Sequence, residues 1–142
     1  MGIKIDNPAS IAMLLVEDDE VILKLQTTIL AVKFPGITLY TAANGRLGLE
    51  LFRAHTPDIV ITDINMAEMC GVQMAANIRA IRPKTIIIAI TGKSCEASVT
   101  GKYLLQSSTG AMVEFDHVIV KPVDLSELYG IIEQSIGDIA NI

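Results

Sequence analysis

Acidic side chains, a hydroxyl and an amine stand at the ends of short apolar runs in this chain. Glu17 and Asp18 follow the first run, and Asp63 follows the third. Thr91 closes the fourth run, and Lys121 closes the fifth. Clustered carboxylates repel one another and favour a bound cation, and oxygen-only ligands suit Mg²⁺. A carboxylate can also attack phosphorus, and the phosphoryl oxygens then need partners such as a lysine and a hydroxyl.

Each of these residues also has an ordinary structural explanation. Asp18 or Asp19 could cap the helix that follows. Thr91 could be a hydroxyl satisfied within a turn, and Lys121 could be a surface lysine. What favours a functional site is that four different runs end in compatible residues, in the right order along the chain.

The apolar runs are predicted to be strands, and helix-period segments alternate with them. The predicted strands are 13–16, 37–41, 59–62, 85–90 and 118–120. The predicted helices are 21–32, 45–54, 72–81 and 125–136, the last with Asp124 as its N-cap. The segment 93–117 has only a loose helical pattern and then a turn signal at 107–110, and we expect it to contain the remaining helix.

This order predicts an α/β fold in which a strand and a helix alternate five times. Continuous apolar strands indicate a sheet covered on both faces. Because parallel crossovers share one handedness, the expected result is a doubly wound, five-stranded parallel sheet between two helix layers, a flavodoxin-like three-layer sandwich. In such sheets ligands bind at the carboxyl ends of the strands.

The composition argues against several classes of function. The 142 residues are 51% hydrophobic with a net charge of −5, which predicts one globular domain. An acidic chain without a basic run argues against direct nucleic-acid binding and against an anionic membrane as partner. No apolar run approaches the roughly 20 residues that span a bilayer. The two cysteines, Cys70 and Cys95, fit a reducing compartment, so we expect a cytoplasmic protein.

The ordered set of motifs resembles the receiver domain of two-component response regulators, of the chemotaxis-regulator type. The motifs are residues 14–19, 58–63 with Asn65, Met66 and Gly71, Thr91-Gly92, and Val120-Lys121-Pro122, with 42–45 before the second helix. The resemblance covers 11–136, which leaves an N-terminal extension at 1–10 and a C-terminal tail at 137–142.

The resemblance implies a phosphoacceptor and a metal site. Asp63 would be the phosphoacceptor. Asp18 and Asp63 would bind Mg²⁺, or Mn²⁺, directly. Glu17 would act largely through water, and Asn65 would contribute its backbone carbonyl.

The resemblance also implies roles for the last two strand ends. Thr91 and Lys121 would contact the phosphoryl group, and the bond between Lys121 and Pro122 would be cis. Asn65 and Lys93 occupy positions that resemble those tuning the lifetime of the phosphoryl group.

Two departures from the family pattern bear on switching and output. Val118 stands where the family often has a Tyr or Phe that moves with the threonine, which puts the usual switch in doubt. The separation of Thr91 and Lys121, 30 residues, is longer than usual by roughly two helical turns. The extra length falls in the fourth-helix region, 93–117.

The function implied is a phospho-accepting receiver that is not a turnover enzyme. Its donor would be a phosphohistidine of a sensor histidine kinase or of a phosphotransfer domain, and its effector a separate protein or a missing domain. One alternative is a receiver-like interaction module that no longer cycles phosphate. Another is a phosphohydrolase on a related fold, which would want a second Asp where this chain has Asn65.

Overall fold

The computed structural model describes residues 11–66, 68–93, 97–98 and 100–140. The predicted extension at 1–10, the last two residues of the predicted tail and Cys95 therefore lie outside the described residues. The main sheet has strands β1 (Ala12–Val16), β2 (Thr38–Ala42), β3 (Ile59–Asp63), β4 (Ile86–Thr91) and β7 (His117–Val120). The helices are α1 (Glu20–Lys33), α2 (Gly45–His55), α3 (Gly71–Ile81) and α4 (Leu125–Ala140). Two further strands, β5 (Tyr103–Gln106) and β6 (Met112–Phe115), form a hairpin.

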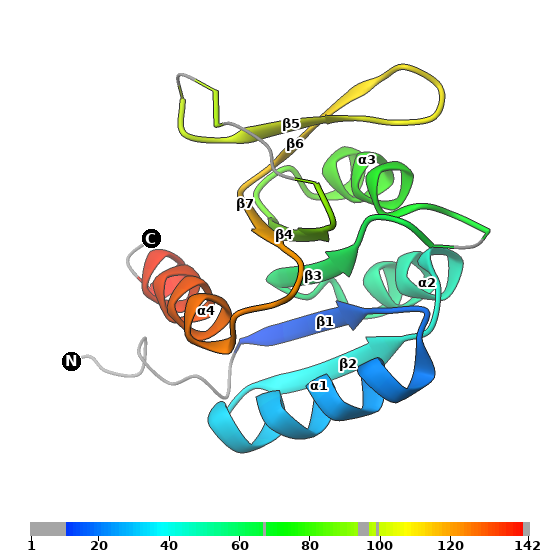
Figure 1. The fold of residues 1–142 in the computed structure, drawn as a ribbon. Coiled ribbons are helices and arrows are strands. Elements are labelled where there is room, and N and C mark those ends of the chain that lie inside the picture. The colour runs from blue at the N-terminus through cyan, green and yellow to red at the C-terminus, as the bar shows by residue number, and fades with distance from the viewer. Residues whose placement is uncertain (1–10, 67, 94–96, 99, 141–142) are drawn as a thin grey trace.

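The predicted five-stranded parallel sheet is confirmed, in the order β2-β1-β3-β4-β7 (Figure 1). Each predicted strand overlaps an observed one. In the parallel register Val16 lies beside Ala42, and Thr91 lies beside Val120. The carboxyl ends of the strands therefore share one edge of the sheet. Among the described residues, no helix combines the length and apolar character needed to cross a bilayer.

Two hydrophobic cores lie on opposite faces of the sheet. One is formed with α2, α3 and the hairpin, and it buries Phe52, Ile78 and Phe115 completely. The other is formed with α1 and α4, and it buries Leu30 and Ile132. The three layers are visible in Figure 1, where α1 and α4 lie on one side of the sheet and α2 and α3 on the other.

The expectation of a fourth helix within 93–117 is wrong, because this segment contains the β5–β6 hairpin. Its side chains alternate with a period of two, which is the strand period. The inward side chains, packed against the first core, are Tyr103, Leu105, Val113 and Phe115, and the exposed ones are Leu104, Gln106, Met112 and Glu114. The predicted turn at 107–110 is present: the Ser107 amide donates to the Ala111 carbonyl, and Gly110 has a φ of +91°. Glycine adopts this left-handed conformation without steric cost.

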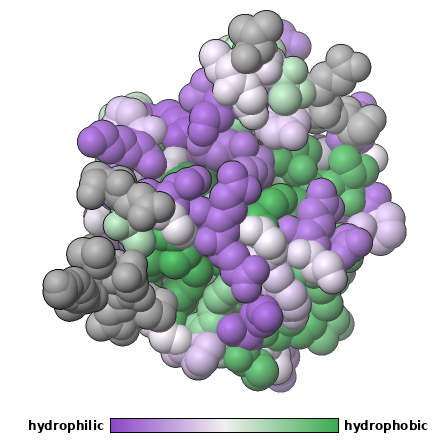
Figure 2. Space-filling model, turned by 90° about the vertical axis from the view of Figure 1, so that its left-hand side faces the viewer, coloured by the Kyte–Doolittle hydropathy of each residue, from purple (hydrophilic) through white to green (hydrophobic). Residues whose placement is uncertain are grey.

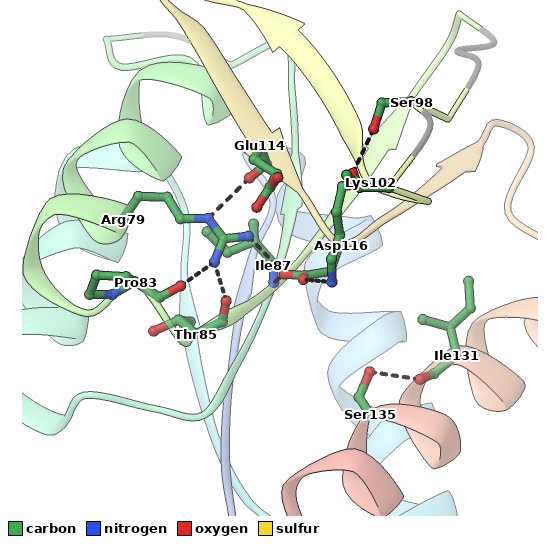
Figure 3. Close-up of polar contacts among 11 residues, drawn as sticks. Arg79, Pro83, Thr85, Ile87, Ser98, Lys102, Glu114, Asp116, Ile131 and Ser135 are labelled. Carbon is green, nitrogen blue, oxygen red and sulfur yellow. Dashed lines mark hydrogen bonds and ion pairs between the residues drawn. The ribbon is translucent and has the colours of Figure 1, made fainter.

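A half-buried carboxylate ties the base of the hairpin to the sheet (Figure 3). Asp116 Oδ2 accepts hydrogen bonds from Arg79 Nη2 at 2.7 Å and from the Ile87 amide at 2.8 Å. Asp116 Oδ1 accepts from Lys102 Nζ at 2.6 Å. Arg79 also donates to the carbonyls of Glu114, Pro83 and Thr85. One carboxylate thus connects α3, β4 and both ends of the hairpin.

Burial alone would raise the pKa of Asp116, but the hydrogen bonds from Lys102, Ile87 and Arg79 outweigh it and hold this pKa below its ordinary value. The charged form is therefore the one that the fold stabilises. Its contribution to stability is present above the pKa of the unfolded chain, and it is lost as the pH falls through the lower folded pKa.

We predict that Asp116→Ala lowers the free energy of unfolding by about 3 kcal/mol near neutral pH, because it leaves Arg79 without its counter-charge. Urea unfolding followed by circular dichroism measures this. The control is Glu50→Ala, which removes the ion pair of Glu50 with Arg46, whose side chains are both more than half exposed. That change should cost less than about 0.5 kcal/mol. The difference between wild type and Asp116→Ala should shrink below about pH 4, and a constant difference would contradict the ionic explanation.

Candidate functional site

The backbone hydrogen bonds of the sheet continue one residue beyond the ends of β1 and β7. The Glu17 amide donates to the Ala42 carbonyl at 3.1 Å, so Glu17 is held although it follows β1. The Lys121 amide likewise donates to the Thr91 carbonyl at 2.8 Å. These bonds hold the chain in position just after β1 and β7. The side chains of four strand ends therefore lie at one edge of the sheet.

Three carboxylates meet at this edge. Glu17, Asp18 and Asp63 each offer an oxygen, and these oxygens lie within 4.8 Å of one another. Glu17 and Asp63 are each only 3% exposed, whereas Asp18 is exposed. Burial raises the pKa of Glu17, and the charge of Asp63 raises it further, although a hydrogen bond from the Asp19 amide opposes both. The cluster therefore carries repulsion that a cation would relieve.

Asp63 has one oxygen engaged and one without a partner. Lys121 Nζ donates to Asp63 Oδ2 at 2.9 Å, and this hydrogen bond raises the pKa of Lys121. Asp63 Oδ1 is buried and has no hydrogen-bond partner among the described residues. Because unpaired buried polar atoms are rare, this oxygen fits a ligand or a cation. The donor set, made only of carboxylate oxygens, fits Mg²⁺.

The structure separates the roles of the two neighbouring aspartates. The Asp19 side chain accepts hydrogen bonds from the amides of Val21 and Ile22, and so caps α1. Asp18 lies in the carboxylate cluster instead. The Asp19 amide donates to Glu17 Oε2 at 3.0 Å, a contact that sequence reasoning missed. The start of α1 is therefore bonded to the acidic cluster.

The remaining site residues surround this cluster or lie behind it. Thr91 is buried, and its hydroxyl oxygen accepts from the Lys93 amide at 3.2 Å. The Lys121–Pro122 bond is cis. Asn65 and Lys93 are exposed, two residues beyond the ends of β3 and β4 respectively. Val118 lies opposite Ala89 in the sheet and packs against the first core.

Gly71 supports the site from behind, and sequence reasoning gave it no role. Its amide donates to the Ile64 carbonyl at 2.8 Å. A Cβ at this position would collide with the carbonyl oxygen of Asp63 and would lie 3.0 Å from the Ile64 Cα. Glycine here lets the start of α3 approach the backbone that carries Asp63. The sequence signal is the glycine immediately before the predicted helix 72–81, which becomes the first residue of the observed α3, where a helix former would be expected.

A cleft lies at the opposite end of the sheet, beside the amino ends of β4 and β7. It has a volume of about 480 Å³ and is lined by charged residues of both signs, among them Arg79, Arg82, Asp116 and Asp138. Figure 2 views this end of the molecule and shows hydrophilic residues running between apolar patches. The cleft contains none of the strand-end residues predicted to form the site, so the acidic cluster is the candidate site.

Comparison with known proteins matches residues 13–133 to the family described as the response regulator receiver domain. The chain is 33% identical over 124 residues to the regulatory protein AtoC of Escherichia coli K12. The match covers 87% of this chain and 25% of AtoC, so the chain spans about a quarter of the length of that relative.

Solved structures share the fold. The CheY-like receiver domain protein of Methanospirillum hungatei superposes with a TM-score of 0.72 at 24% identity, covering 92% of this chain and 97% of that one. A chain from the complex of the histidine kinase ThkA with the response regulator protein TrrA gives a TM-score of 0.69 at 25% identity, covering 88% of this chain and 97% of that one.

We predict that Gly71→Ala lowers the free energy of unfolding by about 1–3 kcal/mol, because the added methyl displaces backbone next to Asp63. It should also weaken Mg²⁺ binding, measured by calorimetric titration. The control is Gly130→Ala in α4, where a Cβ meets no atom within 4 Å. That variant should be unchanged or more stable by up to about 1 kcal/mol. Equal effects of the two substitutions would contradict the steric explanation.

Proposed function

The chain belongs to the response regulator receiver domain family, and from this premise we propose that Asp63 accepts a phosphoryl group from a phosphohistidine. The observation that carries the proposal is the state of the Asp63 carboxylate. It is buried, it has Lys121 on one oxygen and no partner on the other among the described residues, and it adjoins two further carboxylates. This arrangement supports a nucleophile next to a cation site.

In the proposed step, an Asp63 oxygen forms a bond to phosphorus while the bond between phosphorus and the histidine nitrogen breaks. The bonding pair stays with the imidazole, and the product is an aspartyl phosphate. Lys121 stays beside the group and offers positive charge to a phosphoryl oxygen. Asp18 and Asp63 would hold Mg²⁺ directly, with Glu17 behind water and the Asn65 carbonyl as a further ligand. When bound, Mg²⁺ supplies positive charge opposite the phosphoryl oxygens.

The proposed chemistry takes place only on the Asp63 side chain of this protein. The receiver promotes its own phosphorylation and slow hydrolysis, and it does not turn over a separate substrate. Phosphorylation would shift an equilibrium between two conformations that already exists. Thr91 would turn toward the phosphoryl group. Val118 has no ring to follow it, so the response would travel along β4 rather than through a moving aromatic side chain.

An exposed apolar surface on α1 supports a protein donor. Val21 is 77% exposed and Leu25 is 58% exposed, and Ile22 lies beside them. Helix α1 begins two residues after Asp18, so this surface adjoins the acidic cluster. Apolar helix surfaces of this kind bind other helices. We therefore propose that a sensor histidine kinase or a phosphotransfer domain docks here, and that a separate protein or a further domain receives the signal.

We predict that acetyl phosphate labels the wild-type chain only when Mg²⁺ is present, and that Asp63→Asn abolishes the label because the amide is not a nucleophile. Mass spectrometry of the intact chain measures this. Beryllofluoride, which imitates a phosphoryl group, should bind under the same condition.

The matched control is Asp19→Asn, which changes a carboxylate outside the cluster and keeps an effective helix cap. This variant should label like the wild type. Full labelling of Asp63→Asn would exclude Asp63 as the acceptor. Absence of labelling in the wild type, with Mg²⁺ bound, would instead favour the receiver-like interaction module that does not cycle phosphate.

Lys93 is proposed to tune the lifetime of the phosphoryl group. Its amide is bonded to the Thr91 hydroxyl oxygen and its side chain is exposed, and the proposal is that this side chain reaches the acyl phosphate or the attacking water. We predict that Lys93→Ala changes the rate of dephosphorylation severalfold, measured by loss of phosphate from the labelled chain. Lys84→Ala, an exposed lysine beside the opposite cleft, should leave the rate unchanged. An unaltered rate in Lys93→Ala would remove this role.

A further inference from the structure

The β5–β6 hairpin presents a strand edge that the proposed phosphoryl chemistry does not use. β5 pairs antiparallel with β6, and this two-stranded sheet is separate from the parallel sheet. β6 packs against the first core through Val113 and Phe115, so it is the inner strand. Figure 1 shows the hairpin outside the main sheet, next to α3. β5 is therefore an edge strand.

The register shows which backbone groups of β5 face outward. The Ser107 amide donates to the Ala111 carbonyl, which makes these two residues a hydrogen-bonded pair. Bonded and non-bonded pairs alternate along an antiparallel ladder, so Leu105 bonds to β6 while Leu104 and Gln106 point their backbone groups away from it. Within the described residues, no hydrogen bond joins the backbone of Leu104 or Gln106 to another segment.

This edge lacks the usual protection against pairing. Natural edge strands carry charges, prolines or bulges that block a second strand. Residues 103–106, Tyr-Leu-Leu-Gln, contain neither a charge nor a proline. On the outer face of the hairpin, Leu104 is 50% exposed and Met112 is 56% exposed. Among the described residues, the hairpin thus offers backbone groups without partners next to exposed apolar side chains.

The charge distribution favours a second copy of this chain as the occupant. The whole chain carries a net charge of −5, so two copies repel one another over most of their surface. Residues 102–115 contain only Lys102 and Glu114 as charged groups, and these cancel. The hairpin is therefore a neutral element on an acidic chain, and two copies can meet there with little repulsion.

We propose that two copies of this chain pair through β5, antiparallel about a two-fold axis at Leu105, to form a continuous four-stranded sheet. In this register Leu104 lies opposite Gln106 of the partner subunit, and the outward backbone groups of both residues are paired. Lys102 lies opposite Ser108 of the partner subunit, so no like charges face each other. A second copy of β5 can bond to the outward backbone groups of this edge with its own sequence. A strand of another protein would need a sequence that matches this edge.

The test measures mass in solution by sedimentation velocity over a dilution series of the full chain. We expect the wild type to approach twice 15.3 kDa as concentration rises. The double variant Leu104→Glu with Gln106→Glu places like charges opposite each other across the two-fold axis. It should weaken association at least about tenfold, because like charges directly opposite destabilise a strand pair. The variant Leu104→Lys with Gln106→Lys should do the same.

A mixture of the two charge variants should recover the dimer, because opposite charges then face each other. This recovery also shows that the weakened variants remain folded, and circular dichroism checks it separately. The control is Met112→Glu, which adds a charge to the same face of the hairpin away from the edge, and it should leave the dimer intact.

Three results would overturn the proposal. A wild-type chain that stays at 15.3 kDa at every concentration would show that a second copy does not occupy the edge. Equal loss of the dimer in Met112→Glu would place the interface elsewhere on the hairpin. Failure of the mixed variants to associate would exclude the two-fold register. Beryllofluoride binding reports on Asp63 and should be the same in all these variants.

Discussion

The repulsion among three carboxylates at one sheet edge is the constraint on which the site depends. Glu17, Asp18 and Asp63 are held close because β1 and β3 are adjacent parallel strands that end side by side. Lys121, delivered by β7, offsets part of the negative charge through its bond to Asp63. The remaining negative charge is what a bound cation would offset. The fold thus maintains a repulsion among the carboxylates that cation binding would reduce.

The site residues could be predicted because each is fixed by a strand that has a clear sequence signal. The five apolar runs identify the strands, and parallel order places their ends together, so the meeting of Asp63 and Lys121 at one edge follows from chain position. Asp19 was harder, since a carboxylate before a helix can be a cap or a ligand. Only the folded structure distinguishes them, because Asp19 caps α1 while Asp18 joins the cluster.

The hairpin and its anchor could not be predicted for a physical reason. Segment 103–115 alternates inward and outward residues over only four positions per strand, and Leu104 and Met112 are apolar yet exposed, which blurs the period. The Asp116 network joins residues from α3, β4 and the hairpin that are up to 37 positions apart. Local sequence patterns carry no information on such contacts. The close approach of Gly71 to the Asp63 backbone was missed for the same reason.

The Asp116 anchor has a consequence for how this fold can vary. Both ends of the hairpin are fastened at the amino end of β4, while the acidic cluster lies at its carboxyl end, about 13 Å away at the rise of a strand. The segment between the two fastened ends of the hairpin only has to cover α3 and β4 with apolar side chains. In this chain the hairpin meets that requirement with Tyr103, Leu105, Val113 and Phe115. The sequence and the secondary structure of this segment can therefore change, and new binding surfaces can arise on it. The acidic cluster at the carboxyl end of β4 is not disturbed by such changes.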